Sequence, residues 1–377
     1  MLRWRVRVAL VVPGGVDRSG QQRVIPALLW LMERLARRHT VHVFALSQEK
    51  EPGDYPLLGA HVHNLGMPSR SAWPGQALLL AGRRLLRGVA RHGPFDVVHA
   101  FWANNPGFLA SLAARRRHLP LVVSLGGGEL VALRDIRYGS QLLARERVKV
   151  RWTLRSASRV TVASGPMDKL ARRHGVTPHV VPLGVDGAFF VEPTAGGPPF
   201  RLLHVGSLNR VKDQATLLRA LRRIVDRGED VHLDVVGEDT LDGSVQSMCS
   251  TLGLASRVTF HGFLPSARTQ PLYRRAHLFL LSSRHEAGPL VVLEAAASGV
   301  PTVGTAVGHV RDFAPDRALA VAVGDDGALA EGVLSLLHDE PRRRAMGAAA
   351  QRQAREHDAD ATAAAFEEIY GQVVAAP

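Results

Sequence analysis

Short apolar runs alternate with longer amphipathic stretches along all 377 residues of the chain. In the first half, seven runs have the length and β-branched content of strands: 6–12, 41–46, 62–65, 96–101, 121–125, 159–163 and 180–182. Helical periodicity occupies the longer intervals, notably 24–38, 76–91 and 142–156. This alternation predicts an α/β fold built on parallel sheets.

A Pro- and Gly-rich segment at 192–199 separates this series from a second one. The strands predicted there are 202–206, 232–236, 258–260, 278–281, 302–305 and 319–323. We therefore predict two Rossmann-like, doubly wound domains, with ligands expected in a cleft near the carboxyl ends of their strands. The predicted divisions are an N-terminal domain at 1–190, a linker at 191–200, a C-terminal domain at 201–355, and a helical tail at 356–377. One placement considered for this tail is against the N-terminal domain.

Composition narrows the class of protein. Hydrophobic residues make up 46% of the chain and charged residues 21%, which excludes a disordered or collagen-like protein. The single cysteine, Cys249, cannot form an internal disulfide. The first apolar run stops at Pro13, too early for a secretion signal, and no run approaches the ~20 residues of a membrane helix. We expect a cytoplasmic protein.

Positive charge is concentrated in the first half of the chain. Residues 1–195 hold 28 Lys and Arg against 12 Asp and Glu, whereas the remainder holds 19 against 22. Residues 74–91 have the pattern of a basic amphipathic helix. Two interpretations stay open: peripheral docking on the anionic inner face of a membrane, or an ordinary packed helix with solvated arginines. Nucleic acid is not expected as a partner, because no binding motif accompanies the charge.

The most informative segment runs from the apolar strand at 278–281 into a predicted helix. Pro289 suits the start of that helix, and Gly299 suits the residue after its end. Free N–H groups at a helix start, together with the helix dipole, form an anion site. The groups that would face the anion are those of Gly288, Leu290 and Val291.

Two carboxylates, Glu286 and Glu294, flank this predicted anion site. Along a helix, eight positions span about 12 Å, which is roughly the length of a nucleoside-diphosphate sugar. The two acids are therefore candidates to bind hydroxyls at each end of such a ligand. The alternative is a capping acid and a buried structural glutamate.

A second strand-to-helix turn occupies residues 204–214. Its Lys212 is one of only four lysines in a chain that otherwise uses arginine. Arg210 and Lys212 are suited to neutralise a diphosphate. Two exposed cations at a helix start are the alternative, which the helix dipole disfavours.

These motifs, in this order, resemble those of the retaining glycosyltransferases of family 4, which have the two-domain GT-B fold. The resemblance rests mainly on Glu286-x7-Glu294 with Gly288-Pro289, and on the preceding Gly206 turn with Lys212. Weaker matches lie at Gly14-Gly15, at Asp96-Val97-Val98-His99, and at 181–186 and 258–262.

The resemblance implies roles for individual residues. Glu294 would bind the ribose hydroxyls and Glu286 the transferred sugar, while Lys212 and Arg210 would bind the diphosphate. The catalytic set is then Glu286, Lys212 and Arg210, without a metal or another cofactor. Further donor contacts are expected from Gly206, Ser207, Gly288, Pro289, Leu290, Val291 and Gly262. Acceptor-side or sugar-side contacts are expected from Gly14, Gly15, His99, Gly127 and Glu129.

The chain departs from the family pattern at three places. Ser207 stands where an arginine often follows the glycine, and Gly308-His309 replaces a Gly-Gly pair. The His-Gly-x-Asp turn appears as Gly126-Gly127-Gly128-Glu129, without the histidine. The histidines at 61 and 63 alternate on a predicted strand with no partner cluster, so the sequence predicts no metal site there.

The function predicted from these features is transfer of a hexose from a nucleotide diphosphate sugar to an unidentified acceptor, with retention. One alternative is a nucleotide-sugar epimerase or hydrolase on the same fold. Another is a non-catalytic relative that binds a nucleotide sugar or a partner protein, motivated by the departures at Gly126 and Ser207.

Overall fold

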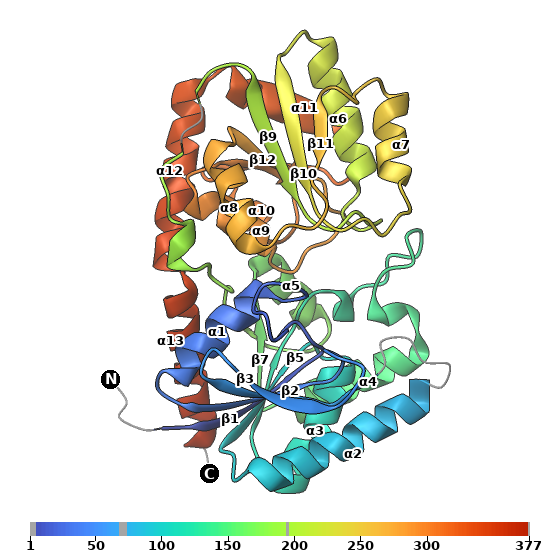
Figure 1. Cartoon of the computed structure of the whole chain (residues 1–377), viewed down its shortest axis with the longest axis vertical. Coiled ribbons are helices and arrows are strands. Elements are labelled where there is room, and N and C mark those ends of the chain that lie inside the picture. The colour runs from blue at the N-terminus through green and yellow to red at the C-terminus, as the bar shows by residue number, and fades with distance from the viewer. Residues whose placement is uncertain (1–4, 68–73, 194–195, 376–377) are drawn as a thin grey trace. The chain divides into compact units, whose positions relative to one another are not determined.

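The structure is a computed structural model that describes residues 5–67, 74–193 and 196–375. The chain divides into two compact units (Figure 1). The N-terminal unit contains Met1–Ala163, Met167–Leu183 and Ala359–Pro377, and the C-terminal unit contains Ser164–Pro166 and Gly184–Asp358. The last helix of the chain therefore belongs to the N-terminal unit.

The N-terminal unit is built on an eight-stranded sheet of order β3-β4-β2-β1-β5-β6-β7-β8. Its strands are β1 Arg7–Val12, β2 Thr40–Ala45, β3 Gly53–Leu57, β4 Ala60–Asn64, β5 Val97–Phe101, β6 Leu121–Ser124, β7 Arg159–Val162 and β8 His179–Val180. Each pairing is parallel except that of β3 with β4. Its helices are α1 Pro26–Ala36, α2 Pro74–His92, α3 Asn105–Arg117, α4 Ala144–Ser156, α5 Gly165–Arg173 and α13 Ala359–Val374, with short 3-10 turns at Gly128–Leu130 and Ser140–Leu142.

Burial on both faces explains why β1 and β5 are almost wholly apolar. Leu10 of β1 packs in a core that also holds Leu31 of α1 and Phe366 of α13. The tail is fixed further by the Tyr370 hydroxyl, whose oxygen lies 2.7 Å from His99 Nδ1. The C-terminal helix is thus an integral part of this unit's core.

The C-terminal unit has a six-stranded, fully parallel sheet of order β11-β10-β9-β12-β13-β14. Its strands are β9 Phe200–Val205, β10 Val231–Val236, β11 Val258–Phe260, β12 Leu278–Leu281, β13 Thr302–Thr305 and β14 Ala318–Val321. Its helices are α6 Gln214–Asp226, α7 Ser244–Thr251, α8 Ser266–Arg275, α9 Leu290–Ala297, α10 Gly308–Phe313, α11 Asp326–Leu337 and α12 Glu340–Glu356, with a 3-10 turn at Gly187–Phe189. The strand order reverses between β9 and β12, and such a switch point is where doubly wound sheets bind ligands.

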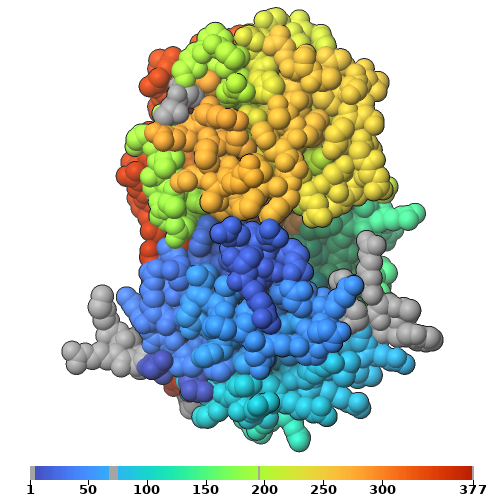
Figure 2. All heavy atoms as spheres, viewed as in Figure 1, coloured from blue at the N-terminus to red at the C-terminus, as the bar shows by residue number. Residues whose placement is uncertain are grey.

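The predicted class, two Rossmann-like α/β domains, is confirmed. The edge strand β3 and the helix α3 are among the elements that the sequence pattern did not predict. Helix α2 (cyan in Figures 1 and 2) lies at the surface of its unit, with Leu79 68% and Leu80 46% exposed and Leu85 and Val89 buried. No helix within the described residues is long and apolar enough to cross a membrane.

Candidate functional site

The loops that follow β9 and β12 are bonded to each other at the switch point of the C-terminal sheet. The Ser282 hydroxyl donates to the carbonyl of Lys212 (2.8 Å), and the Arg284 N–H donates to the carbonyl of Val211 (2.8 Å). Parallel strands that are neighbours end at the same edge, so these two loops meet directly. The backbone thereby places the Lys212 side chain beside the segment that leads into α9.

Lys212 and Glu286 form an ion pair, with Lys212 Nζ 2.5 Å from Glu286 Oε1. The Ser283 hydroxyl donates to the same oxygen at 2.6 Å. Their side chains are 20% and 12% exposed, respectively, so both groups are mostly shielded but reachable from solvent. An ammonium has three donors, which leaves two for a ligand while Glu286 occupies one. Sequence reasoning named Lys212 and Glu286 separately, and the structure joins them.

The turn after β9 is shaped to present Lys212. The Lys212 backbone N–H donates to Asn209 Oδ1 (3.0 Å). The next residue, Asp213, has a left-handed φ of 49°, and its side chain caps α6 by accepting a hydrogen bond from the Thr216 N–H. A Cβ on Gly206 would lie 3.4 Å from Lys212 Cε, so the lysine stem passes close to the glycine. Arg210, predicted beside Lys212 in the diphosphate site, is exposed.

Helix α9 starts where the sequence predicted, with Pro289 as its N-cap residue and Gly299 (φ 69°) just after its end. The N–H groups of Leu290 and Val291 are the first two of the helix and have no intrahelical acceptor. Gly308 packs against this start: a Cβ there would be 2.5 Å from Pro289 Cδ. The glycine of the Gly308-His309 pair is therefore required by packing.

Glu294 is buried inside the C-terminal unit, 6% exposed, with Oε2 accepting a 2.8 Å hydrogen bond from the Tyr273 hydroxyl. Burial raises the pKa of Glu294 to about 7, which the Tyr273 bond only partly offsets. Burial and the neighbouring Glu294 also raise the pKa of Tyr273 well above its usual value. Tyr273, which lies in the arginine-rich helix α8, was not identified from any sequence motif.

His309, which stands where the family pattern has the second glycine of a Gly-Gly pair, is also buried. Burial lowers its pKa to about 4, against a smaller opposite effect of Glu286. The imidazole is therefore neutral at physiological pH. Its Nε2 is buried without a hydrogen-bond partner among the described residues.

In the N-terminal unit, Glu129 organises the glycine turn that follows β6. Its two carboxylate oxygens accept hydrogen bonds from the backbone N–H groups of Ala103 (3.2 Å), Gly126 (2.9 Å) and Gly127 (2.6 Å). Glu129 is fully buried, and burial raises its pKa despite these bonds. The carboxylate predicted as a sugar-side contact thus serves to hold the turn itself.

Trp102 occupies the space beside the position that lacks the family's histidine. A Cβ on Gly126 would lie 2.0 Å from the indole Nε1 of Trp102, so a side chain at 126 is excluded while Trp102 keeps this place. Trp102 itself has φ 71°, a strained conformation for a bulky residue. The absence of a side chain at Gly126 therefore makes room for the Trp102 indole. The sequence showed the missing histidine but not the tryptophan that fills its place.

Three predicted acceptor-side residues lie in two different environments: Gly14 and Gly15 lie at a cavity, and His99 lies in the core. Gly15 lines a cavity of about 600 Å³ with residues of both charges; the others are Arg23, Ser47, Gln48, Glu49, Lys50, Glu51 and Met67. Gly14 lies beside it, where a Cβ would be 3.2 Å from the Ser47 carbonyl oxygen. His99 is fully buried and bonded to Tyr370 and to Ser124, so the structure gives it a packing position rather than an acceptor-side one.

The remaining predicted donor contacts surround the C-terminal strand ends. The Ser207 carbonyl accepts from Gln214 Nε2 (3.2 Å), and the Gly262 carbonyl accepts from the Gly237 N–H (2.9 Å). Gly262 is exposed with φ 65°, and Phe263 beside it is 53% exposed.

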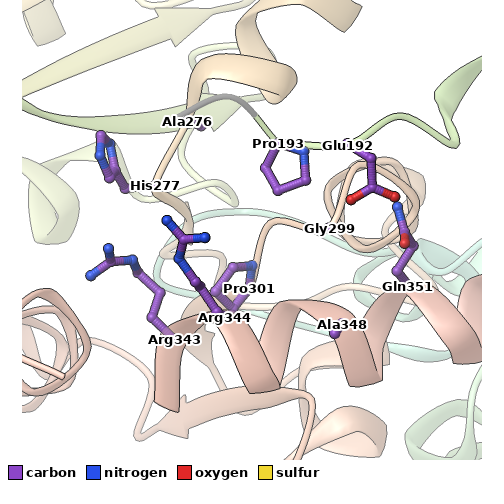
Figure 3. Close-up of a pocket in the computed structure, with 10 residues that line it drawn as sticks. All are labelled: Glu192, Pro193, Ala276, His277, Gly299, Pro301, Arg343, Arg344, Ala348 and Gln351. Atoms are coloured by element: carbon purple, nitrogen blue, oxygen red, sulfur yellow. The ribbon is translucent and has the colours of Figure 1, made fainter. Parts of the chain in front are cut away.

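A further cavity of about 210 Å³ lies in the C-terminal unit, and polar side chains that line it hold the backbone together (Figure 3). Helix α12 contributes Arg343 and Gln351 to its lining. Arg343 Nη1 donates to the Leu336 carbonyl, and Gln351 Nε2 donates to the carbonyls of Val191 and Ala297. These polar groups already satisfy backbone acceptors, and none of the predicted site residues lines the cavity.

Comparison with known proteins identifies the family of the chain. Residues 187–353 match the family described as glycosyl transferases group 1, and residues 20–184 match the glycosyl transferase 4-like domain. A D-inositol 3-phosphate glycosyltransferase of Thermomonospora curvata is 30% identical over 325 residues, covering 76% of this chain and 74% of the relative.

Two solved structures share the GT-B fold with this chain. Sucrose-phosphate synthase from Thermosynechococcus elongatus superimposes with a TM-score of 0.84 at 19% identity, covering 99% of this chain and 100% of the other. Anabaena HepE in complex with UDP-glucose gives 0.74 at 16% identity, covering 98% and 100%. The chain belongs to the group 1 glycosyltransferases and is an enzyme of the transferase class.

Proposed function

We propose that this glycosyltransferase moves a hexose from a UDP-sugar to a hydroxyl of a small polyol phosphate, with retention of the anomeric configuration. The observation that carries the donor side is the Lys212–Glu286–Ser283 cluster beside the start of α9. The relative's name supports the acceptor class, and the UDP-glucose complex of HepE supports the donor.

Each group has a distinct task in this proposal. Lys212 and the first N–H groups of α9 bind the diphosphate and stabilise the charge that develops on it as the glycosidic bond breaks. Glu286 accepts hydrogen bonds from hydroxyls of the transferred sugar, and its contact with Lys212 fixes both side chains before the donor arrives. Glu294, ionised when the donor binds, accepts the two ribose hydroxyls. Phe263, which is exposed beside Gly262, stacks on the base.

The acceptor side is proposed to lie at the cavity bordered by Gly15. Arg23 and Lys50 provide cations for a phosphate, while Glu49 and Glu51 provide acceptors for hydroxyls. Arg23 is already paired with Asp17 and Glu49, so it is positioned before any ligand arrives.

Product analysis tests the proposal. The protein is incubated with UDP-glucose or UDP-N-acetylglucosamine, with and without an inositol phosphate, and the products are followed by NMR. We expect an α-linked glycoside only when acceptor is present, and at least a hundredfold loss of rate in Lys212→Ala. Release of free sugar or of an epimerised donor at the same rate without acceptor would instead favour a hydrolase or an epimerase.

We also propose peripheral contact of α2 with an anionic membrane. Leu79 and Leu80 are exposed next to the exposed Arg83 and Arg87, the pattern of an interfacial helix. Sedimentation with vesicles tests this: binding is expected with anionic vesicles and reduced in Leu79→Ser. Equal binding to neutral and anionic vesicles at low salt would end the idea.

A further inference from the structure

Three histidines on one face of the N-terminal sheet form a cluster with a fourth at the end of α2. His42 of β2 is the register partner of His61 on β4, and His63 follows two residues later on the same face. His92, the last residue of α2, stacks on His63 with ring centroids 4.2 Å apart. The sequence suggested that the histidines at 61 and 63 lack a partner cluster. That prediction is wrong, because β2 and α2 supply the partners.

Three of these histidines converge. The imidazole nitrogens that His42, His63 and His92 offer all lie within 4.8 Å of one another. His42 and His63 are buried, whereas His92 is half-buried at a helix end. His42 Nδ1 and His63 Nε2 are 2.9 Å apart. Two nitrogens that share a tetrahedral zinc ion at 2.0–2.1 Å are about 3.3 Å apart, so a small ring movement separates the observed spacing from the required one.

Asp54 of β3 orients the cluster. Its carboxylate can only accept, so the 2.9 Å contact with His63 Nδ1 places the proton on that nitrogen. The His63 Nε2 lone pair then accepts the hydrogen bond from His42 Nδ1–H, so a metal ion that takes both nitrogens requires the His42 proton to move to its Nε2. A carboxylate behind a histidine is the arrangement that fixes the tautomer of metal-binding imidazoles.

Both buried imidazoles are neutral at physiological pH. Burial, followed by the neighbouring histidines, lowers the pKa of His42 to about 4, and burial lowers the pKa of His63 in spite of Asp54. Neutral imidazole is the form that binds metal. The Arg7 guanidinium donates to the His92 carbonyl (2.8 Å), so its positive charge would repel a bound metal ion. The negative charge of Asp54 offsets this repulsion.

We propose that His42, His63 and His92 bind one divalent transition-metal ion of the zinc class, with Asp54 as the residue that orients His63. An all-imidazole set suits zinc, copper, nickel and cobalt over magnesium or calcium. Binding requires the exposed edge of His92 to turn from its stacked position toward the other two nitrogens. The ion would join β2, β4 and the carboxyl end of α2, which are distant in sequence, into one stabilised corner of the unit.

Zinc titration of the full-length, tag-free, chelator-treated protein tests the site, in competition with a chromophoric chelator. We expect one zinc ion per chain with a submicromolar Kd, and at least a hundredfold weaker binding in His42→Ala and in His63→Ala. Asp54→Asn, whose side chain is 65% exposed, should weaken binding about 10- to 100-fold through the tautomer alone. His179→Ala, an exposed histidine on β8, is the matched control and should leave the affinity unchanged.

Two further readouts make the outcome decisive. Cobalt in place of zinc should give the visible bands of a tetrahedral site in the wild type and not in His63→Ala. The proposal is overturned if the wild type binds no zinc tightly, or if a His42→Ala/His63→Ala protein binds it as well as His179→Ala does. Should the core variants fail to fold, unchanged affinity in Asp54→Asn overturns it.

Discussion

Replacing Glu294 by glutamine should make the protein more stable while it weakens donor binding. The carboxyl is buried, and its pKa is raised from 4.5 to about 7. Between these two values the folded protein keeps a proton that the unfolded chain has released, so stability falls as the pH rises through this window. At 1.36 kcal/mol per decade, the penalty above pH 7 is about 3 kcal/mol.

Glutamine has nearly the same shape, carries no charge, and still accepts the hydrogen bond from Tyr273. Glu294→Gln should therefore gain up to about 3 kcal/mol at pH 8 and almost nothing at pH 4.5. Hydrogen exchange in urea, read on peptides of β9 to β12, is the suitable assay, because all five tryptophans precede residue 153 and do not report on this unit. Glu331→Gln, an exposed glutamate on α11, is the matched control.

The reasoning is refuted if Glu294→Gln is no more stable than the wild type at pH 8. It is also refuted if the stabilisation is the same at pH 4.5, because the gain would then not come from the buried charge. A stable variant that binds UDP as tightly as the wild type would keep the electrostatic argument but remove the ribose role.

Three other predictions test single contacts. Lys212→Ala should lower kcat/KM by at least a hundredfold in a transfer assay, whereas Lys212→Arg should retain part of it, since the cation but not its fit to Glu286 is kept. Gly126→Ala should destabilise the N-terminal unit in thermal unfolding, and a second change, Trp102→Ala, should restore stability by removing the clash; no rescue would show that the turn rejects a side chain for another reason. Tyr370→Phe should cost about 1–2 kcal/mol in chemical unfolding followed by tryptophan fluorescence, because it removes a buried hydrogen bond that anchors α13; an unchanged midpoint would contradict this.

The sequence predicted the fold well where burial leaves a clear pattern. The central strands read as continuous apolar runs, because both faces of a parallel sheet are covered. The edge strand β3 was missed because its Asp54 and Pro56 disfavour a strand, although an antiparallel edge tolerates both. Helix α3 was missed because its alanines and arginines show little periodicity.

Site residues were predictable where they belong to a local motif. Lys212 and Glu286 follow strands that prove to be neighbours, so each local turn carried the signal. Tyr273 was not predictable, because it reaches Glu294 from a different helix. The partnership of His63 with His92 likewise depends on how α2 packs, which spacing along the chain does not encode.

The most direct test of the donor site is a calorimetric titration of UDP, GDP and ADP into the wild type, Glu294→Ala and the matched control Glu331→Ala. The account predicts that UDP binds the wild type and the control with the same affinity and binds Glu294→Ala at least tenfold more weakly, a loss of about 1.4 kcal/mol or more. Equal affinity of UDP for all three proteins would contradict the assignment of Glu294, and with it the placement of the nucleotide along α9.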